Sequence, residues 1–477
     1  MMKTMFFKIW NSIIGKICIV LLGINFILSL YNLFQLSAYI NTLSLFIVSF
    51  VVIVILLLLI LCTYKLPKLS LVFHIILCIL LVIGCLVFNR ASSFTNQITQ
   101  TDEVETVEID VLKESTLDEN SSLDGLTMGC FLDDSTGLTR AREILKEHEK
   151  TGVKEKQYDN MKDAYQDLLD NKIDMIVITS LSSSYLEEDV ADYRDHIRPL
   201  FIKEYAIENT FQNEKLDITK EAFTVYLGGV DLSCNGKING TGRGDVNILL
   251  TINPTTKKAS MQVVPRDLYS YIPIKDAHSK LSYSGNWGGV QSSIASIEHE
   301  LGVKINYYAK INFDGLIDLI DKIGGINVYS HYDYTINDFH YQKGMNHVNG
   351  EQALAMARER KSLPLNERSR GLQQMEIIKG IMNKLFENPS YDYMMSALDS
   401  IQENFMTNLP ENQFIDAFQL FLSMRDTLMN IETYSMDGEY KWHYDEVKKG
   451  YYLYYFYPSD GEIEKVRDRI NNILQGN

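Results

Sequence analysis

Acidic side chains are absent from the first 90 residues of this 477-residue chain. That stretch contains six lysines or arginines, so the remaining residues hold 39 basic against 61 acidic side chains. An acidic body of this kind lacks the basic groove that binds nucleic acid. We therefore expect no nucleic-acid partner.

Cysteines outside apolar runs and common catalytic motifs are also scarce. Only Cys130 and Cys234 of the six cysteines lie outside apolar runs, and no CxxC spacing occurs, which excludes a disulfide framework. A single bridge between these two stays an alternative, although they fall in different predicted domains. The chain has no GxxxxGK[ST] phosphate loop and no GxSxG nucleophile elbow. The glycines of the GxGxG run (Gly240, Gly242, Gly244) precede a strand rather than a helix, which excludes a dinucleotide fingerprint.

Long apolar runs open the chain, and each approaches the ~20 residues that cross a bilayer. They predict three transmembrane helices within residues 1–90, at about 17–36, 43–62 and 69–88. No small-residue cleavage site follows the first run, so we interpret all three as retained anchors. Lysines lie before the first run and between the second and third, whereas the first connection is uncharged. The positive-inside rule then predicts a cell-membrane protein with a cytoplasmic amino terminus and an extracytoplasmic body.

The body divides into three predicted segments. Residues 91–124 are polar and acidic and predict a linker. Strand and helix patterns alternate over residues 125–215, which predicts a small α/β accessory domain. Within it, Asp133 and Asp134 precede a helix, and capping is their expected role. Residues 220–477 form the predicted catalytic domain, also of the α/β class.

Charged residues gather at the ends of three predicted strands between residues 223 and 273. The strands are β-branched and aromatic runs bounded by Gly, Asn, Pro and Lys. Asp231, Arg243, Asp245 and Arg266 lie at their ends and connections. Carboxylates are ligands for hard divalent cations, and guanidinium groups bind phosphate oxygens in a planar, bidentate way. The pattern predicts a metal-assisted phosphoryl or pyrophosphate site, with ordinary solvated loop charges as the alternative.

Further elements follow this stretch. Periodicity predicts a strand at 304–312 and helices at 290–301, 313–325, 350–360, 373–386, 392–405 and 412–424. Arginines at helix ends or in short loops (Arg358, Arg360, Arg368, Arg370) add donors that could neutralise a pyrophosphate. The aromatic segment 440–458 is interpreted as sheet packing, with a sugar platform as the alternative.

The order of these motifs resembles the LytR-CpsA-Psr (LCP) family of extracytoplasmic phosphotransferases. The resemblance covers about residues 223–385, and it consists of Gly229-Val230-Asp231, Arg243-Gly244-Asp245, Asn253-Pro254, Pro265-Arg266-Asp267, Lys280, Gly324-Gly325, residues 350–360, and Arg370 followed by Gln373-Gln374. The three membrane helices and the accessory domain look like the capsule-polysaccharide branch of that family, found in Gram-positive bacteria.

The resemblance implies a mixed sheet flanked by helices, and transfer of a glycan from polyprenyl pyrophosphate to peptidoglycan. Asp231 and Asp245 would hold Mg²⁺ or Mn²⁺. The residues that would bind the pyrophosphate are Arg243, Arg266, Lys280, Arg358, Arg360, Arg370 and Gln374. The expected catalytic residues are Asp231, Arg243, Arg266, Arg360 and Arg370. An apolar tunnel between the sheet and the helices would hold the lipid.

Alternatives stay open at this stage. The same site could act as a lipid pyrophosphatase with water as acceptor. A membrane regulator or attenuator of envelope or capsule expression is disfavoured, because the predicted cytoplasmic part is about 16 residues and a short loop, too small to fold. The general base is not identified, with Asp231 and Asp267 as candidates. A Gly-Gly-Asp segment of the family is replaced here by residues 365–367, and Arg368 is a candidate substitute for the missing charge.

Overall fold

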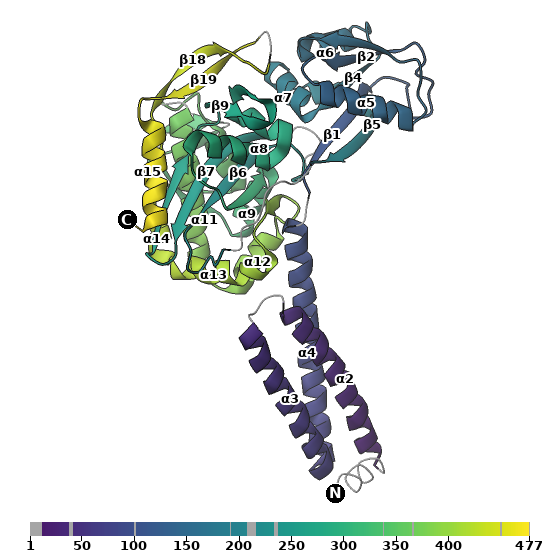
Figure 1. The fold of residues 1–477 in the computed structure, drawn as a ribbon, viewed down its shortest axis with the longest axis vertical. Coiled ribbons are helices and arrows are strands. Elements are labelled where there is room, and N and C mark those ends of the chain that lie inside the picture. Colours follow the sequence, from purple (N-terminus) through teal and green to yellow (C-terminus); the bar gives the residue numbers. More distant parts are fainter. Residues whose placement is uncertain are drawn as a thin grey trace. The chain divides into compact units, whose positions relative to one another are not determined.

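The computed structural model describes residues 12–37, 42–99, 102–190, 192–207, 216–232, 237–336, 338–364, 367–448 and 451–476. The chain divides into two compact units (Figure 1). The first contains residues 1–99 and 409–419, and the second contains residues 100–408 and 420–477. The predicted accessory and catalytic domains therefore lie in the same unit.

Three apolar helices make up most of the first unit, as predicted. They are α2 (Ile13–Leu36), α3 (Thr42–Lys65) and α4 (Pro67–Thr99). Each contains a span long and apolar enough to cross a membrane, and most of their large apolar side chains face outward. Polar contacts lie between the helices instead, since the Asn25 Nδ2 donates to the His74 carbonyl oxygen at 3.2 Å. This distribution suits helices that are surrounded by lipid.

The prediction of a linker over residues 91–124 is wrong for two parts of that segment. Helix α4 continues to Thr99, and residues Val104–Leu112 form strand β1. Three apolar residues of β1 (Val107, Ile109, Val111) are fully buried. Its acidic residues made the segment look solvated, but Glu108 is paired with Arg194 at 2.5 Å. Both the strand partners and this counter-charge come from much later in the chain, so local patterns could not reveal them.

The accessory domain contains a five-stranded sheet in the order β3-β2-β4-β1-β5. Strands β2 (Thr127–Phe131), β3 (Lys154–Tyr158) and β4 (Met175–Thr179) are parallel, and β1 runs antiparallel between β4 and β5 (Ile197–Ala206). Its helices are α5 (Ser135–Glu147), α6 (Met161–Leu169) and α7 (Ser180–Asp189). The sheet therefore begins at β1, about twenty residues before the predicted boundary.

The accessory domain contains Asp134, which was expected to cap a helix, and Cys130, one of the two cysteines outside the apolar runs. The Gly137 backbone N–H donates to Asp134 Oδ1 at 2.8 Å, which confirms that Asp134 caps α5. Cys130 is a free thiol buried in the domain core. A free Cys130 argues against the single bridge to Cys234 that the sequence left open; Cys234 itself lies outside the described residues.

The catalytic domain is built on a six-stranded mixed sheet in the order β16-β11-β6-β7-β8-β17. Strands β6 (Phe223–Asp231), β7 (Arg243–Asn253) and β8 (Lys258–Val263) are antiparallel neighbours. Strands β11 (Tyr307–Asn312) and β17 (Glu432–Ser435) join in parallel, and β16 (Phe405–Thr407) joins antiparallel. This arrangement confirms the predicted α/β class.

Helices cover both faces of this sheet (Figure 1). Helices α8 (Ser284–Leu301) and α15 (Glu462–Gln475) bury Ile294, Ile297, Val466 and Ile470 against the face that carries Tyr226. Helices α9 (Phe313–Lys322), α10 (Gly350–Arg358), α11 (Glu367–Glu387) and α12 (Tyr391–Asp399) lie on the other face. Helices α13 (Phe414–Ser423) and α14 (Arg425–Met429) follow. Side chains that alternate along β6 therefore face two different layers.

The catalytic domain also contains small two-stranded sheets. Strands β9 (Tyr269–Ile272) and β10 (Ala277–Lys280) pair, as do β12 (Ile326–Ser330) with β15 (Gly344–Val348), and β13 (Tyr334–Ile336) with β14 (Phe339–Tyr341). Near the carboxyl terminus, β18 (Gly438–Tyr444) and β19 (Tyr452–Pro458) form an antiparallel hairpin, here called the aromatic hairpin. Figure 1 shows this hairpin near β9.

A buried ion pair joins the accessory domain to the catalytic sheet. Glu103, directly before β1, accepts from Lys310 Nζ at 2.7 Å and from the Val290 backbone N–H at 2.7 Å. Lys310 also donates to the Gly240 carbonyl oxygen at 2.9 Å. The side chains of Glu103 and Lys310 are 3% and 2% exposed, so solvent does not screen this pair.

Replacing Glu103 by alanine should destabilise the protein by about 3 to 5 kcal/mol, because Lys310 would stay buried without its counter-charge. The measurement is the melting temperature of the full-length protein, which should fall by several degrees. Glu204→Ala is the control. It removes the solvent-exposed Glu204–Lys237 pair and should cost less than about 1 kcal/mol. Similar shifts in both variants would contradict a special role for the buried pair.

Candidate active site

The ends of β6 and β7 bring the first predicted site residues together. Asp231 ends β6 and is paired in register with Arg243, which begins β7. An Arg243 terminal nitrogen lies 2.9 Å from Asp231 Oδ2, and Arg243 Nε lies 3.4 Å from Asp245 Oδ1. Because Arg243 and Asp245 are two residues apart on one strand, their side chains leave the same face of the sheet.

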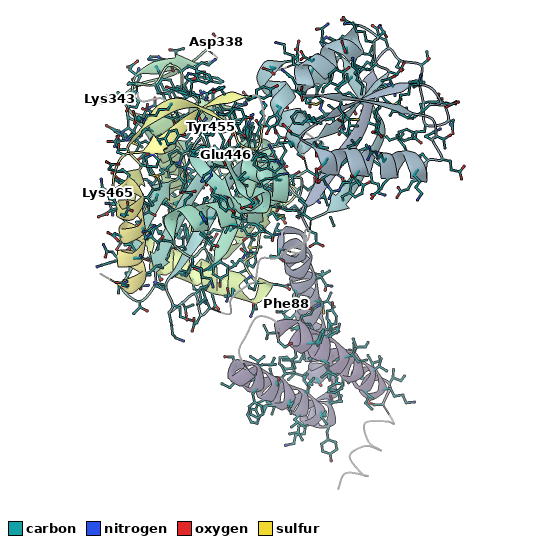
Figure 2. All side chains as sticks on the ribbon, turned by 45° about the horizontal axis from the view of Figure 1, so that its top comes forward. Phe88, Asp338, Lys343, Glu446, Tyr455 and Lys465 are labelled. Carbon is teal, nitrogen blue, oxygen red and sulfur yellow. The ribbon has the colours of Figure 1, made fainter. Side chains whose placement is uncertain are left out.

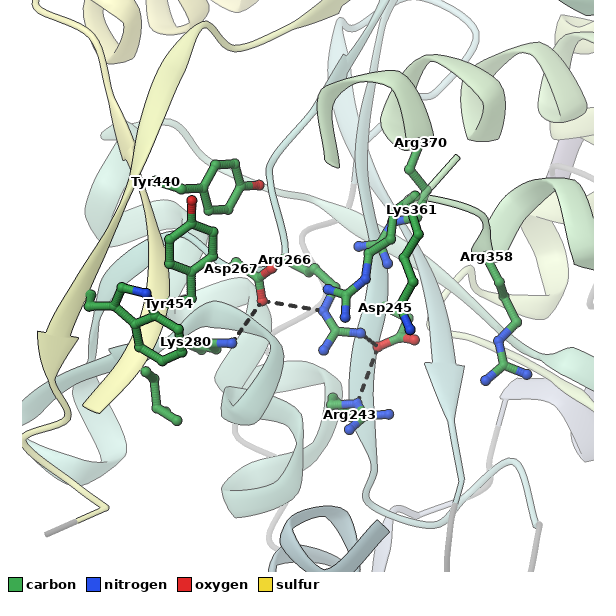
Figure 3. Close-up of a pocket in the computed structure, with 13 residues that line it drawn as sticks. Arg243, Asp245, Arg266, Asp267, Lys280, Arg358, Lys361, Arg370, Tyr440 and Tyr454 are labelled. Carbon is green, nitrogen blue, oxygen red and sulfur yellow. Dashed lines mark hydrogen bonds and ion pairs between the residues drawn. The ribbon is translucent and has the colours of Figure 1, made fainter. Parts of the chain in front are cut away.

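The chain after β8 extends this cluster. An Arg266 terminal nitrogen lies 2.5 Å from Asp245 Oδ1, and Arg266 Nε lies 3.5 Å from Asp267 Oδ1. Lys280, at the end of β10, places Nζ 3.3 Å from the same Asp267 oxygen. Figure 3 shows these side chains converging. The result is a continuous row of alternating charges from Asp231 to Lys280.

Asp245 and Asp267 are ionised at neutral pH. Burial alone would raise the pKa of Asp245, but the nearby guanidinium groups of Arg266 and Arg243 outweigh it and lower the pKa to about 2. Burial opposes ionisation of Asp267 as well, yet Lys280 and Arg266 lower its pKa. Neither carboxylate can therefore serve as a proton donor near neutral pH.

Helices α10 and α11 supply the remaining cations. Arg358 ends α10, Arg360 and Lys361 follow it, and Arg370 lies in the first turns of α11. Together with Arg243, Asp245, Arg266, Asp267 and Lys280 they line a cavity of about 790 Å³ (Figure 3), here called the charged cavity. Seven basic residues face two carboxylates in it. Such an excess of positive charge, presented mainly by guanidinium groups, suits a ligand with several phosphate oxygens.

An apolar cavity of about 220 Å³ adjoins the charged one. Its walls come from the sheet (Leu227, Val246, Ile311) and from the helices on that face (Leu316, Ile377, Ile381). It shares Asp245, Arg358 and Arg370 with the charged cavity. An apolar cavity thus lies between sheet and helices, where the family resemblance implies a lipid tunnel.

Most predicted site residues meet at the charged cavity. Those that line it are Arg243, Asp245, Arg266, Lys280, Arg358, Arg360 and Arg370. Asp231 does not line it and joins the site through Arg243. Gln374 lines the apolar cavity instead, and its Nε2 donates to the Ala357 carbonyl oxygen at 3.0 Å.

The structure argues against the alternative of solvated loop charges at the centre of the cluster. The Arg243 and Arg266 side chains are only 12% and 10% exposed. Arg368 differs, since it is exposed, pairs with Asp437 at 2.8 Å and does not line the charged cavity. It is therefore not the replacement charge considered above. Residues 365 and 366 of the altered family segment lie outside the described residues.

Two carboxylates at this site suit a divalent cation that is shared with a substrate. The described part of the chain contains no cluster of three or more His, Cys, Asp or Glu side chains that could hold a metal alone. Mg²⁺ at phosphoryl sites commonly uses one or two carboxylates and completes its shell with substrate phosphates and water. Asp231 and Asp245, the two carboxylates that the resemblance assigns to the metal, both contact Arg243, at 2.9 and 3.4 Å.

Comparison with known proteins decides the family. Residues 200–472 match the model of the LytR_cpsA_psr family. The chain belongs to the LytR-CpsA-Psr family. The matched residues include the whole catalytic sheet and its helices, whereas the three apolar helices and most of the accessory sheet lie outside the match.

Relatives of this family member carry names that describe polymer transfer. It is 30% identical over 255 residues to the polyisoprenyl-teichoic acid–peptidoglycan teichoic acid transferase TagU of Bacillus anthracis, covering 54% of this chain and 80% of that protein. TagU of Bacillus licheniformis is 32% identical over 219 residues, which cover 46% and 69% of the two chains. The crystal structure of Bacillus subtilis TagV is 26% identical, with a TM-score of 0.46, over 54% of this chain and 98% of that one.

Several residues that line the charged cavity of this LCP protein were not among the predicted site residues. Lys361 lies next to Arg360 and lines the charged cavity, as do Tyr440, Trp442 and Tyr454 from the aromatic hairpin. Every residue from Tyr454 to Tyr457 is aromatic, and this was the available signal, because successive side chains of a strand point to opposite faces and so give both faces an aromatic surface.

The accessory domain also contributes an acid near the site. Glu187 lies in α7, and burial together with the charge of Asp231 raises its pKa to about 7, against the opposing influence of Arg243. Nothing in the sequence linked Glu187 to the motif residues of the catalytic domain. Its position depends on how the two domains pack.

Proposed function

We propose that this LCP protein transfers a glycopolymer from a polyprenyl pyrophosphate carrier to peptidoglycan. The observation that carries this proposal is that the charged and apolar cavities adjoin and share Asp245, Arg358 and Arg370. A polyprenyl pyrophosphate combines an apolar chain with a polyanionic head group, and it requires these two environments side by side. The names of the TagU relatives, which specify a polyisoprenyl-linked donor and a peptidoglycan acceptor, support the same chemistry.

The arginines would bind the pyrophosphate and stabilise its charge during the reaction. An acceptor hydroxyl oxygen attacks the phosphorus that bears the sugar, and the bond from that phosphorus to the bridging oxygen breaks. Polyprenyl phosphate leaves, and the hydroxyl proton is lost to solvent or to a base. Guanidinium groups that contact the oxygens of the leaving phosphate offset the negative charge that develops there.

The carboxylates serve this reaction by position and charge rather than as strong bases. The lowered pKa values of Asp245 and Asp267 make them weak proton acceptors. Asp245 holds Arg266, and Asp267 holds Lys280, so each orients a cation at the cavity wall. We propose that Asp231 and Asp245 also hold Mg²⁺ or Mn²⁺, which would supply further neutralisation of the pyrophosphate.

The polymer that we propose is a capsular polysaccharide or a teichoic-acid-like glycopolymer of a Gram-positive cell wall. The named relatives favour teichoic acid, whereas three membrane helices with an accessory domain resemble the capsule branch of the family. The test is to delete the gene and measure which polymer is lost from purified peptidoglycan. Unchanged wall-linked polymer in the deletion strain would contradict the assignment.

Product analysis separates transfer from hydrolysis. The full-length protein would be incubated with a labelled polyprenyl-pyrophosphate glycan, with and without peptidoglycan. We expect labelled glycan on the peptidoglycan, and release of polyprenyl phosphate only when peptidoglycan is present. Equal release without peptidoglycan would identify a lipid pyrophosphatase. No release under either condition would favour a regulator.

The proposed reaction also requires that the body lie outside the cell membrane. Lysines lie near the amino-terminal end of α2, and Lys65 and Lys68 lie at the adjoining ends of α3 and α4. Together with three membrane-spanning helices, they support a cytoplasmic amino terminus. A reporter that is active only in the cytoplasm, fused after Asn477, should then be silent. An active reporter would overturn this orientation.

A further inference from the structure

The aromatic hairpin presents two different faces. Trp442 is paired in register with Tyr454, and Tyr440 with Phe456, so these four side chains share one face. The ring centroids of Tyr440 and Tyr454 lie 5.1 Å apart with planes inclined by 23°, and those of Trp442 and Tyr454 lie 5.3 Å apart. The rings therefore form a continuous aromatic surface.

The opposite face of the hairpin packs against the domain along its length. Tyr455, labelled in Figure 2, is fully buried. The Tyr269 ring of β9 lies 5.1 Å from the Tyr455 ring and 5.3 Å from the Tyr457 ring. Sheet packing, which the sequence predicted for this segment, thus accounts for the Tyr455 face. On the Trp442 face, Phe456 and Tyr440 also pack on the core, but packing does not account for Trp442 and Tyr454.

The Trp442 face is exposed beside the charged cavity. Trp442 is 68% exposed and Tyr454 is 44% exposed, and both line that cavity with Tyr440. Large exposed aromatic surfaces are unfavourable in water and mark interaction sites when they gather in one place. Since the rings are already held by one another, a ligand would order few additional side chains on binding.

The apolar cavity, the charged cavity and the aromatic surface of the hairpin follow one another, and this order indicates what the aromatic surface binds. Arg358 lies between the apolar and charged cavities, and Figure 3 shows it on the opposite side of the charged cluster from Tyr440 and Tyr454. A donor with its chain in the apolar cavity and its pyrophosphate at the arginines would extend its sugar towards the aromatic hairpin. The C–H faces of a pyranose ring are apolar and carry slight positive charge, and they stack on the electron-rich faces of aromatic rings.

We propose that Trp442 and Tyr454 form a pyranose-binding subsite for the first sugars of the lipid-linked donor. The inference rests on the proposed function, because it places the pyrophosphate of the same donor at the arginines. Stacking requires a ring face rather than a particular set of hydroxyl groups. Such a subsite would therefore accept different sugars while still distinguishing a glycosylated carrier from a bare one.

Binding of two probes tests this subsite. They are farnesyl pyrophosphate and farnesyl pyrophosphoryl-N-acetylglucosamine, measured with the full-length protein in lipid nanodiscs. Trp442→Ala should weaken binding of the glycosylated probe by about 3- to 10-fold and change binding of farnesyl pyrophosphate less than about 2-fold. Tyr452→Ala is the matched control, because Tyr452 is exposed on the same hairpin but does not line the charged cavity, and it should affect neither probe.

The possible outcomes separate this inference from the proposed function. Equal losses for both probes, or no loss for either, would overturn the subsite without contradicting the proposed function. A variant that binds both probes normally but shows a raised KM for peptidoglycan would assign the aromatic surface to the acceptor and overturn the inference. A wild-type protein that binds neither probe would contradict the proposed function itself, and the subsite with it.

Discussion

Lysine in place of any one of four cavity arginines should lower the rate of glycan transfer by roughly 30- to 1000-fold. Lysine keeps the positive charge but loses the planar, bidentate donor geometry that suits phosphate oxygens. Losing one such contact in a desolvated site costs about 2 to 4 kcal/mol of transition-state stabilisation. The positions are Arg266, Arg358, Arg360 and Arg370. The measurement is transfer from a labelled polyprenyl-pyrophosphate glycan to peptidoglycan.

Arg368→Lys is the control for this series. Arg368 lies two residues from Arg370, but it is exposed and pairs with Asp437 outside the charged cavity. Its replacement should change activity and stability by no more than about 0.5 kcal/mol. The melting temperatures of the four cavity variants should stay near that of the wild type. Normal transfer in all four would refute the site, and parallel losses of transfer and melting temperature would make these arginines structural.

Asp245→Asn should reduce transfer by at least about 100-fold without weakening the binding of a polyprenyl pyrophosphate. The substitution removes one negative charge from a cavity in which cations already dominate, so the affinity for an anionic head group should not fall. The rate should fall because Arg266 and Arg243 lose the carboxylate that orients them, and because one of the two proposed metal ligands is lost. Transfer and binding would be measured on the same preparations.

A chelator distinguishes the loss of a metal ligand from the loss of the carboxylate that orients Arg243 and Arg266. If Asp231 and Asp245 hold a divalent cation, a chelator should inhibit the wild type strongly and have little further effect on Asp245→Asn. Asp437→Asn serves as the charge control, since Asp437 is exposed and forms its ion pair with Arg368, outside the charged cavity. A wild type that is insensitive to chelation would refute the metal role and leave the arginine site in place. Weakened binding of the pyrophosphate by Asp245→Asn would show that Asp245 has a structural role instead.

Local patterns in the sequence were sufficient for several features of this protein. Helices α2, α3 and α4 follow from long apolar runs, because a single segment in a bilayer satisfies its own backbone hydrogen bonds only as a helix. The strands β6, β7 and β8 and the cap at Asp134 depend on residues that are close together in the chain. Motif order and spacing also pointed to the family, which the match over residues 200–472 establishes.

The convergence of the site depended on the tertiary structure. Arg266, Arg358 and Arg370 come from segments far apart in the sequence, and only the packing of α10 and α11 beside the sheet brings them to one cavity. The same packing separates Arg368, which faces solvent, from Arg370 two residues later. Sequence spacing could not make that distinction.

Strand pairing and the two faces of the aromatic hairpin were likewise decided by long-range contacts. Strand β1 resembled a linker because its acidic residues find counter-charges only after the chain has folded. The sequence showed that residues 440–458 are aromatic, but their division into a packed face and a cavity face depends on the contact with Tyr269 of β9. Sequence alone therefore determined the membrane helices, the strands β6, β7 and β8, and the chemistry of the charged residues at their ends. The tertiary structure decided which side chains meet, because charge pairing and ring stacking act between residues that lie far apart in the chain.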